Sequence, residues 1–314
     1  MKRRTRSKIL IGPSFFGERD KLPLLSLIEA GFEVVDNPFK RKLTKSELIE
    51  LLGKDVSGLI AGIEPIDKEV MQKSNLKVIS RCGSGMANVD TEAADDLGIK
   101  VYSTPYGPTT AVAELTVGAI LSLLRHLPRM NQDMHQYKWN KRIGSQLQDK
   151  YVSIIGFGRI GQKVGQLLHA FEAKVVAVDP AFSGKVNSFP VVKLDEALKN
   201  ADIILLHCSG DKVILGEEEF SLMKRNVYLI NAARGEVIDE EELIKALDRG
   251  QIAGAWIDTF SKEPYTGPLC RYEQVILTPH VGSYTLECRR QMEMEAAKNL
   301  IDGFRETGSD SQTR

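Results

Sequence analysis

Three polar side chains of complementary chemistry lie in the last third of the chain, each a few residues after a short apolar run that is typical of a strand. They are Arg234, Glu263 and His280. A guanidinium grips a carboxylate through two parallel hydrogen bonds, and an imidazole takes up and returns a proton near neutral pH. A carboxylate beside that imidazole favours its protonated form. This combination suits the oxidation of a 2-hydroxy acid, or the reverse reduction of a 2-keto acid.

Each of these residues taken alone also has an ordinary structural interpretation, as a surface ion pair, a turn residue or a hydrogen-bonded histidine. Their shared placement favours the functional one. The strands that precede them are predicted at 227–230, 252–257 and 275–277. Because the carboxyl ends of parallel strands meet at one edge of a sheet, we expect the three side chains to converge beside a bound cofactor.

A glycine-rich turn earlier in the chain indicates what that cofactor is. The strand predicted at 151–155 runs into Gly156-Phe157-Gly158-Arg159-Ile160-Gly161 and then into a helix, which is the context that the GxGxxG pattern requires. Gly156 permits the tight turn, Gly158 lets a pyrophosphate approach the backbone, and Gly161 lets the helix pack closely on the strand. The amino end of the helix presents free N–H groups to the phosphates.

Asp179 ends the next predicted strand, 174–178, at the spacing expected of an acid that binds a ribose. A carboxylate there would repel a 2′-phosphate, so the sequence favours NAD over NADP. A P-loop does not fit, because Gln162 and Lys163 stand where Lys and Ser or Thr are required. An adenosyl site of the methyltransferase type would also use an acid at this strand end, but it would not need the three later side chains.

The elements that position these residues follow an alternating pattern of short apolar runs and helical segments. The pattern predicts an α/β protein of two doubly wound parallel-sheet domains, of the Rossmann or flavodoxin type. Thr44 followed by Glu47 predicts a capping box at the start of a helix. A long helical stretch over about 110–137 is expected to kink or end at Pro128.

Composition excludes several other classes of protein. The 314 residues carry 42 basic and 42 acidic side chains, so no net charge gathers nucleic acid. The longest apolar run, near Leu115–Leu124, is too short to span a membrane. The four cysteines are scattered without a CxxC pair, which argues against a disulfide framework and a structural zinc site. We expect no nucleic-acid partner, no membrane partner and no metal.

The first residues are basic, but they do not read as a signal peptide. Basic residues at positions 2–8 precede only three apolar residues, Ile9–Ile11, before a glycine and a proline break the run. A signal peptide needs a longer apolar region and a cleavage site with small residues. We therefore expect a cytoplasmic protein whose first strand begins near Lys8.

The order of the motifs resembles that of the D-isomer-specific 2-hydroxyacid dehydrogenases, most closely their D-3-phosphoglycerate dehydrogenase branch. The similarity runs from about Gly58 to Phe304. It is carried by the segments Arg81–Asp90, Thr104–Glu114, Gly156–Gly161, Asn231–Gly235, Asp258–Pro264 and Thr278–Ser283.

The resemblance implies roles for individual residues. His280 would be the acid and base, Glu263 its partner, and Arg234 the group that binds the substrate carboxylate and carbonyl. The backbone of a loop formed by Ser84, Gly85 and Met86 would also meet the substrate. The cofactor NAD would contact Gly156, Phe157, Gly158, Arg159, Ile160, Gly161, Asp179, Pro180, Cys208, Ala232, Ala233, Asp258, Gly282 and Ser283.

The resemblance also implies a discontinuous layout. A substrate-binding domain would comprise residues 1–101 and 283–314, with an NAD-binding domain, residues 102–282, inserted in it. Members of the family are commonly homodimers joined through the cofactor domains, and here the helical stretch 110–137 would contribute. The expected ligand is a small 2-hydroxy or 2-keto acid.

Two departures from the family pattern bear on the substrate and the cofactor pocket. Glu64 stands where phosphoglycerate dehydrogenases often carry a basic residue, and it would repel a phosphate if it faced the cleft, although Arg81 could compensate. The loop His207–Lys212 is short and lacks a proline.

A different class of function also stays open, namely an NAD(H)-sensing, corepressor-like protein that keeps the fold without turnover.

Overall fold

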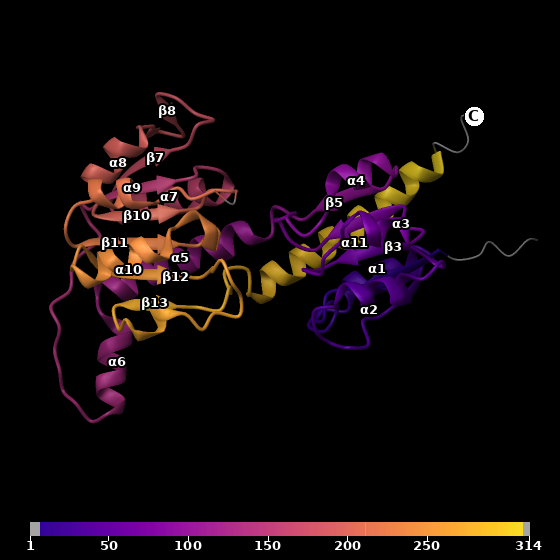
Figure 1. Cartoon of the computed structure of the whole chain (residues 1–314), viewed down its shortest axis with the longest axis horizontal. Coiled ribbons are helices and arrows are strands. Elements are labelled where there is room, and N and C mark those ends of the chain that lie inside the picture. The colour runs from indigo at the N-terminus through magenta and orange to yellow at the C-terminus, as the bar shows by residue number, and fades with distance from the viewer. Residues whose placement is uncertain (1–6, 211, 310–314) are drawn as a thin grey trace, which may run out of the picture. The chain divides into compact units, whose positions relative to one another are not determined.

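The computed structural model describes residues 7–210 and 212–309, and its contacts divide the chain into two compact units. Unit 1 comprises Met1–Pro108 and Tyr284–Arg314, and unit 2 comprises Thr109–Ser283. Each is an α/β unit built on a parallel sheet, which confirms the predicted fold class (Figure 1). The basic residues at positions 2–6 lie outside the described residues.

Unit 1 is built on a five-stranded parallel sheet with the order β2-β1-β3-β4-β5. Helix α11 comes from the far end of the chain and packs against α1, β3, β4 and β5, so this domain needs both ends of the chain. The strands are β1 (Lys8–Ile11), β2 (Glu33–Val35), β3 (Val56–Ala61), β4 (Val78–Arg81) and β5 (Lys100–Ser103). The helices are α1 (Leu22–Glu29), α2 (Lys45–Leu52), α3 (Lys68–Gln72), α4 (Thr91–Asp96) and α11 (Leu286–Ser309).

Two sequence predictions about unit 1 have clear outcomes. The capping box at the start of α2 is present, with the Thr44 hydroxyl accepting from the Glu47 N–H and the Glu47 carboxylate accepting from the Thr44 N–H. The unit ends later than the residue 101 expected. Strand β5 belongs to the first sheet, where Tyr102 pairs with Ser80 and Ser103 with Arg81.

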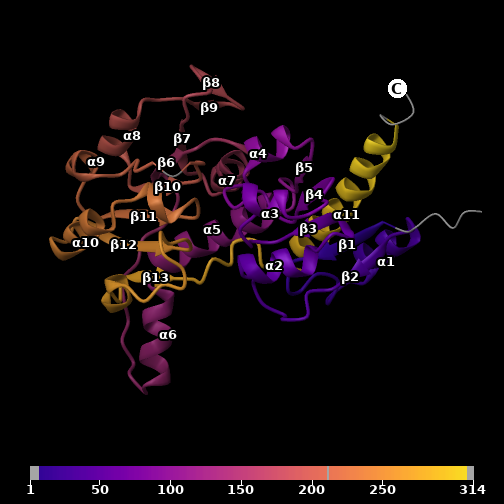
Figure 2. The ribbon, with the colours of Figure 1, turned by 45° about the vertical axis from the view of Figure 1, so that its right-hand side comes forward.

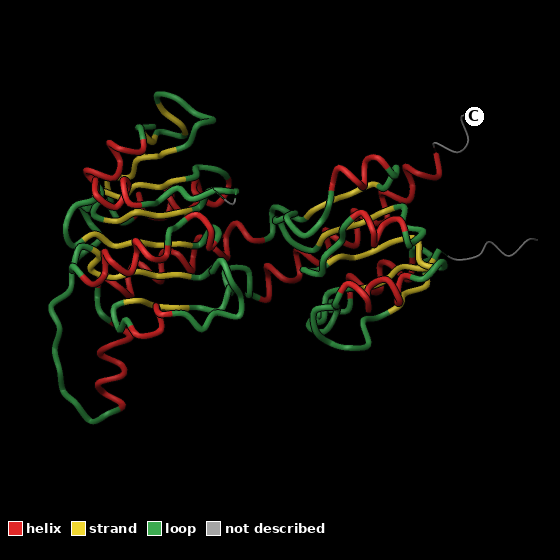
Figure 3. The backbone as a smooth tube through the Cα atoms, in the orientation of Figure 1, coloured by secondary structure: helices red, strands yellow, loops and turns green. Residues whose placement is uncertain are grey.

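Unit 2 is built on a six-stranded parallel sheet with the order β13-β12-β11-β10-β6-β7. Figure 3 draws the strands of both units in yellow. The strands are β6 (Tyr151–Ile155), β7 (Lys174–Val178), β10 (Ile203–Leu206), β11 (Val227–Asn231), β12 (Ile252–Ile257) and β13 (Val275–Leu277). The chain also forms a small antiparallel pair, β8 (Lys185–Val186) and β9 (Phe189–Pro190). The helices are α5 (Pro108–Leu124), α6 (Leu127–His135), α7 (Arg159–Ala170), α8 (Leu194–Asn200), α9 (Glu217–Leu222) and α10 (Glu240–Asp248).

The sheet of unit 2 is buried on both faces, and neighbouring residues of one strand enter different clusters. On β10, Ile204 and Leu206 belong to one hydrophobic cluster, while Ile203 and Leu205 belong to the other. The strand order reverses direction between β6 and β10, because β7 lies on one side of β6 and β10 on the other. In open parallel sheets, that switch point is where ligands bind, at the carboxyl ends of the strands.

The long helical stretch at the start of unit 2 breaks earlier than predicted. Helix α5 ends at Leu124, and α6 begins at Leu127 after His126, whose φ of 52° lies in the left-handed region. The axes of the two helices differ by 65°. Pro128 does not end the first helix; it lies in the first turn of the second, where its missing N–H has no intrahelical partner to lose.

Helix α6 and the segment that follows it project from the body of unit 2 in both ribbon views (Figures 1 and 2). No residue of α6 is buried. Among the described residues, no single helix is both long and apolar enough to cross a membrane, although α5 and α6 taken together meet the length and composition test as a bent pair.

Candidate active site

The glycine turn between β6 and α7 has the geometry that a bound pyrophosphate requires. Gly156 has a φ of 88°, and a Cβ there would come within 2.3 Å of the Cys208 amide nitrogen. A Cβ on Gly161 would lie 2.3 Å from the Gly156 carbonyl oxygen. Around Gly158, by contrast, nothing lies within 4 Å of the same position. The two outer glycines therefore close the turn, and the middle one leaves open space beside the amino end of α7.

Asp179 at the end of β7 is tied to this turn. One carboxylate oxygen accepts the Phe157 N–H at 2.7 Å, and the other accepts the Ala181 N–H at 2.9 Å. Each oxygen keeps a lone pair for a further donor. The carboxylate is thus fixed next to the open side of the turn, where it suits the hydroxyls of a ribose. The residues present fit NAD, which the turn and Asp179 would hold.

The segment after β10, His207 and Cys208, packs against the glycine turn and carries uncharged side chains. Both ring nitrogens of His207 are buried without a hydrogen-bond partner among the described residues, and burial lowers the pKa of His207 to about 4. Burial also raises the pKa of the neighbouring Cys208 thiol. Both side chains are therefore neutral at physiological pH, and neither supplies an acid–base group.

The loop that carries His280 is held by a buried carboxylate. Asp258, 1% exposed at the end of β12, accepts the Thr278 hydroxyl and the Val281 N–H with one oxygen, and the Gly282 N–H at 2.9 Å with the other. His280 adopts a φ of 53°, in the left-handed region. An unusual backbone conformation persists where the surroundings determine it, and here the bonds to Asp258 lie on both sides of the histidine.

Thr278 and Trp256 complete this support, and the sequence analysis did not single either of them out. The Trp256 indole N–H donates to the Thr278 hydroxyl oxygen at 2.9 Å, and that hydroxyl donates on to Asp258. Trp256 is fully buried on β12. A threonine two residues before a candidate catalytic histidine was the available signal, but a hydroxyl's partner depends on a fold that spacing alone does not define.

His280 and Glu263 are brought together. The histidine Nδ1 lies 3.1 Å from each carboxylate oxygen of Glu263, and both side chains are substantially exposed, at 51% and 40%. Glu263 Oε1 also accepts the Phe260 N–H at 3.1 Å. With the proton on Nδ1, the other ring nitrogen is the one able to accept a proton from a substrate. That nitrogen, Nε2, has no hydrogen-bond partner within the described residues.

Arg234 reaches the same region by a different contact. Its loop follows β11, and the Asn231 amide braces it by donating to the Arg234 carbonyl and accepting the Ala233 N–H. A Cβ on Gly235 would lie 1.9 Å from the Ser261 amide nitrogen, so this loop packs directly on the loop that leads to Glu263. Within the described residues Arg234 donates to the Ala233 carbonyl and contacts neither Glu263 nor His280 directly. Most of its N–H donors are left for a ligand.

The remaining predicted cofactor residues lie at the same edge of this sheet. Pro180 follows Asp179, Ala232 and Ala233 follow β11, and Ser283 follows Gly282 at the end of the unit. Arg159 and Ile160 open α7. Contact between these residues and NAD stays a prediction. Among the described residues, no group of three or more His, Cys, Asp or Glu side chains is placed to hold a metal ion.

The predicted substrate loop belongs to unit 1. Ser84, Gly85 and Met86 follow the carboxyl end of β4, and Ser84 is exposed. Gly83 just before them is held by Thr104, whose hydroxyl accepts the Gly83 N–H at 2.7 Å. Exposed backbone at the carboxyl end of a parallel strand suits an anionic ligand, and substrate binding by this loop stays a prediction.

Glu64 does not present a charge to solvent. It is 1% exposed, and its carboxylate accepts the Gly62 N–H at 2.8 Å. A Cβ on Gly12 would lie 2.1 Å from the same carboxylate, which shows how closely the neighbouring loop covers it. Burial raises the pKa of Glu64. Repulsion of a substrate phosphate was expected only if this side chain faced the cleft, and its carboxylate is instead buried within unit 1.

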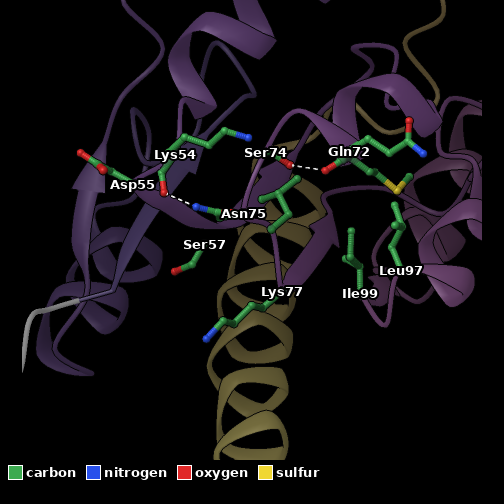
Figure 4. Close-up of a pocket in the computed structure, with 11 residues that line it drawn as sticks. Lys54, Asp55, Ser57, Gln72, Ser74, Asn75, Lys77, Leu97 and Ile99 are labelled. Atoms are coloured by element: carbon green, nitrogen blue, oxygen red, sulfur yellow. Dashed lines mark hydrogen bonds between the residues drawn. The ribbon is translucent and has the colours of Figure 1, made fainter.

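A hollow of ≈ 540 Å³ in unit 1 is not this site (Figure 4). It is lined by loops at the amino ends of β3, β4 and β5, including Lys54, Ser74 and Leu97. None of the predicted catalytic or binding residues lines it. The predicted substrate loop of unit 1 lies at the opposite edge of the same sheet.

The fold and the turn define the general class of this protein as a two-unit α/β protein whose inserted unit binds a dinucleotide. Residues 117–282 match the family model described as "D-isomer specific 2-hydroxyacid dehydrogenase, NAD binding domain". The chain belongs to the D-isomer specific 2-hydroxyacid dehydrogenase family.

Two curated relatives indicate its place in the family. The chain is 36% identical over 287 residues to D-3-phosphoglycerate dehydrogenase of Sus scrofa, an alignment covering 88% of this chain and 53% of the relative. It is 33% identical over 276 residues to hydroxypyruvate reductase of Thermotoga maritima, covering 85% and 89%. The chain thus spans about half the length of the phosphoglycerate dehydrogenases that it matches.

A solved structure agrees with the fold. The TT0316 protein from Thermus thermophilus superposes with a TM-score of 0.87 at 32% sequence identity, covering 95% of this chain and 97% of that one.

The hydrogen bonds that link Trp256, Thr278 and Asp258 predict a positioning role for Thr278. Thr278→Val removes the hydroxyl that links Trp256 to Asp258 and leaves a buried indole N–H without an acceptor. We expect kcat for the reaction proposed below to fall about tenfold because His280 loses its fixed position. The affinity for NADH, measured by fluorescence titration, should stay within about twofold.

The matched control is Ser153→Ala, which removes another buried hydroxyl of unit 2, bonded to the Ala197 carbonyl. It should leave kcat unchanged. If Thr278→Val kept full kcat with a folded protein, Thr278 would have no positioning role.

Proposed function

We propose that this protein interconverts a D-2-hydroxy acid and its 2-keto acid with NAD as the hydride carrier. The observation that carries the proposal is the Glu263–His280 pair at the carboxyl edge of a sheet that also holds the glycine turn. The names of the relatives, D-3-phosphoglycerate dehydrogenase and hydroxypyruvate reductase, both denote chemistry on 2-hydroxy or 2-keto acids.

Each residue of the site has a separate role in the proposed reaction. Bound NAD supplies the hydride chemistry. Arg234 grips the substrate carboxylate with its planar fork and polarises the carbonyl. During oxidation the His280 Nε2 accepts the hydroxyl proton, and it returns a proton to the carbonyl oxygen during reduction. Glu263 keeps the other nitrogen protonated and stabilises the cationic ring that forms.

The substrate is proposed as a small 2-keto acid, and the test is a panel monitored by NADH absorbance. It contains 3-phosphohydroxypyruvate, hydroxypyruvate, pyruvate, glyoxylate and 2-ketoglutarate. We expect one of the first two to give the highest kcat/KM, because relatives are named D-3-phosphoglycerate dehydrogenase and hydroxypyruvate reductase, and the buried Glu64 does not oppose a phosphate. NADH binding with no turnover of any member would contradict an enzyme and favour an NAD(H)-sensing protein.

We propose a cytoplasmic location for this reaction.

Arg234→Ala should abolish most turnover. Removing a group that grips the substrate and stabilises developing charge typically costs on the order of 10³ in rate, and we expect kcat/KM to fall by about that factor. Steady-state kinetics on the best panel substrate measure it. The control is Arg225→Ala, another arginine of unit 2, which among the described residues donates to the Arg249 carbonyl at 3.5 Å. Near-normal kcat/KM in the Arg234 variant would remove it from the assigned role.

Asp179 is proposed to set a preference for NADH over NADPH. Asp179→Asn keeps an acceptor for the backbone of the turn but removes the charge that repels a 2′-phosphate. We expect the ratio of kcat/KM for NADH to that for NADPH to fall by at least about tenfold. Equal use of both coenzymes by the unmodified protein would contradict the ribose interpretation.

We also propose a homodimer formed through α6 and the segment after it, residues 136–146. Tyr137, Trp139 and Ile143 are 76–101% exposed, and Met134 on α6 is about half exposed. The segment is nonetheless anchored, because Arg142 pairs with Asp133 at 2.8 Å and the Ser145 N–H donates to the Leu124 carbonyl. Exposed aromatic and aliphatic side chains on a fixed projection are typical of an interface.

Ile143→Asp should therefore give a monomer at low micromolar concentration, because it places a charge at the centre of a desolvated interface. Sedimentation velocity measures the mass. Leu97→Asp, at an exposed leucine of unit 1, is the control and should leave the mass unchanged. A monomeric unmodified protein, or a dimeric Ile143 variant, would refute this interface.

A further inference from the structure

Helix α1 in unit 1 carries an apolar face that nothing in the described chain covers. Leu22, Leu25 and Ile28 are each about half exposed, at 46–48%. The opposite side of the helix is buried, with Pro23 and Leu27 in the interior and α11 packed against it. Single exposed leucines are common, but three at a spacing of three residues form a continuous stripe.

The stripe has a symmetric pattern. At about 100° per residue, Lys21, Leu22, Leu25, Ile28 and Glu29 all fall within an arc of roughly 120° centred on Leu25. The order along the face is positive, apolar, apolar, apolar, negative. Lys21 is the N-cap and already has helical dihedral angles, so the face includes both ends of the helix.

This pattern is complementary to itself when a second copy is rotated by 180° about an axis through Leu25. The antiparallel arrangement sets Leu25 against Leu25 of the second copy and brings Leu22 level with Ile28 of the second copy, on the opposite side of the contact. It sets Lys21 against Glu29 of the second copy, and the symmetry repeats every contact. A two-fold interface requires this property, because residue i must meet j while j meets i.

The charges at the two ends support the same arrangement. Neither Lys21 nor Glu29 forms an ion pair within residues 7–210 and 212–309. Each also lies at the end of α1 that its charge disfavours, with a cation at the amino end and an anion at the carboxyl end. An antiparallel second helix supplies the opposite charge at each end, which relieves both.

We propose that α1 is a self-association surface through which two copies of this chain pack α1 against α1, antiparallel, about a two-fold axis at Leu25. The contact is separate from the interface proposed for α6, which lies in unit 2. A helix of eight residues buries much less than the roughly 800 Å² per partner of a stable interface. We therefore expect this association to be weak and to link dimers that form through α6.

The test is sedimentation velocity of the full chain from about 1 to about 200 µM at low salt. The weight-average mass of the unmodified protein should rise with concentration above its low-concentration value. Lys21→Glu and Glu29→Lys, made separately, set like charges against each other at both symmetric positions. Each should raise the concentration needed for association by at least about fivefold.

The double variant Lys21→Glu with Glu29→Lys restores the pairing and should associate like the unmodified protein. An equimolar mixture of the two single variants should also associate, because each then meets the opposite charge on the other. Both substitutions place charges where the helix dipole favours them, so weaker association cannot come from a weaker helix. Far-UV circular dichroism checks the folding.

Lys77→Glu and Glu50→Lys make the same changes in net charge at exposed positions elsewhere in unit 1, and they should leave association unchanged. A mass that stays constant over the whole range would overturn the proposal. So would single swaps that behave like these controls, or a double swap that fails to recover. The last result would indicate that a different partner, with no two-fold pattern, covers α1.

Discussion

The position of His280, the proposed acid–base group, depends on one buried carboxylate. Asp258 ends β12 in the interior of unit 2, and its two oxygens accept from the Thr278 hydroxyl and from the backbone of Val281 and Gly282. Burying a charge costs free energy unless hydrogen bonds compensate for it. Moving the loop away would leave the Asp258 carboxylate buried without these partners, so its hydrogen bonds hold the loop in place. His280 lies within that loop, in a left-handed conformation, and its ring can therefore project from the sheet edge without being packed itself.

The loops approach one another closely because two of their residues are glycines, which have no side chain. Gly156 allows the backbone after β10 to press on the turn after β6, and Gly235 allows the loop after β11 to lie on the loop after β12. At each point a Cβ would come within 2.3 Å of backbone atoms, which cannot shift as a flexible side chain can. Neighbouring strand ends in a sheet lie about 4.8 Å apart, and loops that leave them normally diverge to make room. Here the absence of side chains lets adjacent loops form one continuous surface.

The sequence was sufficient for the fold class, the glycine turn and the pairing of Glu263 with His280, because each depends on a local pattern or on the order of strands. It was insufficient where the outcome depended on packing. Pro128 reads as a helix end, yet it lies at a helix start, since the left-handed residue that breaks the helix is His126, which carries no such signal. Glu64 reads as a surface charge, yet loops distant in sequence bury it.

The two histidines that follow strands in unit 2 show why residue type alone does not assign acid–base chemistry. His207 follows β10 with both ring nitrogens buried, so desolvation lowers its pKa to about 4. His280 follows β13, is half exposed, and has one nitrogen bonded to the Glu263 carboxylate. A proton shuttle must hold both protonation states at similar free energy, which needs solvent or a counter-charge on one side and an open nitrogen on the other. Of these two histidines, His280 has the exposure, the neighbouring carboxylate and the open nitrogen that the proposed role needs, whereas both ring nitrogens of His207 are buried.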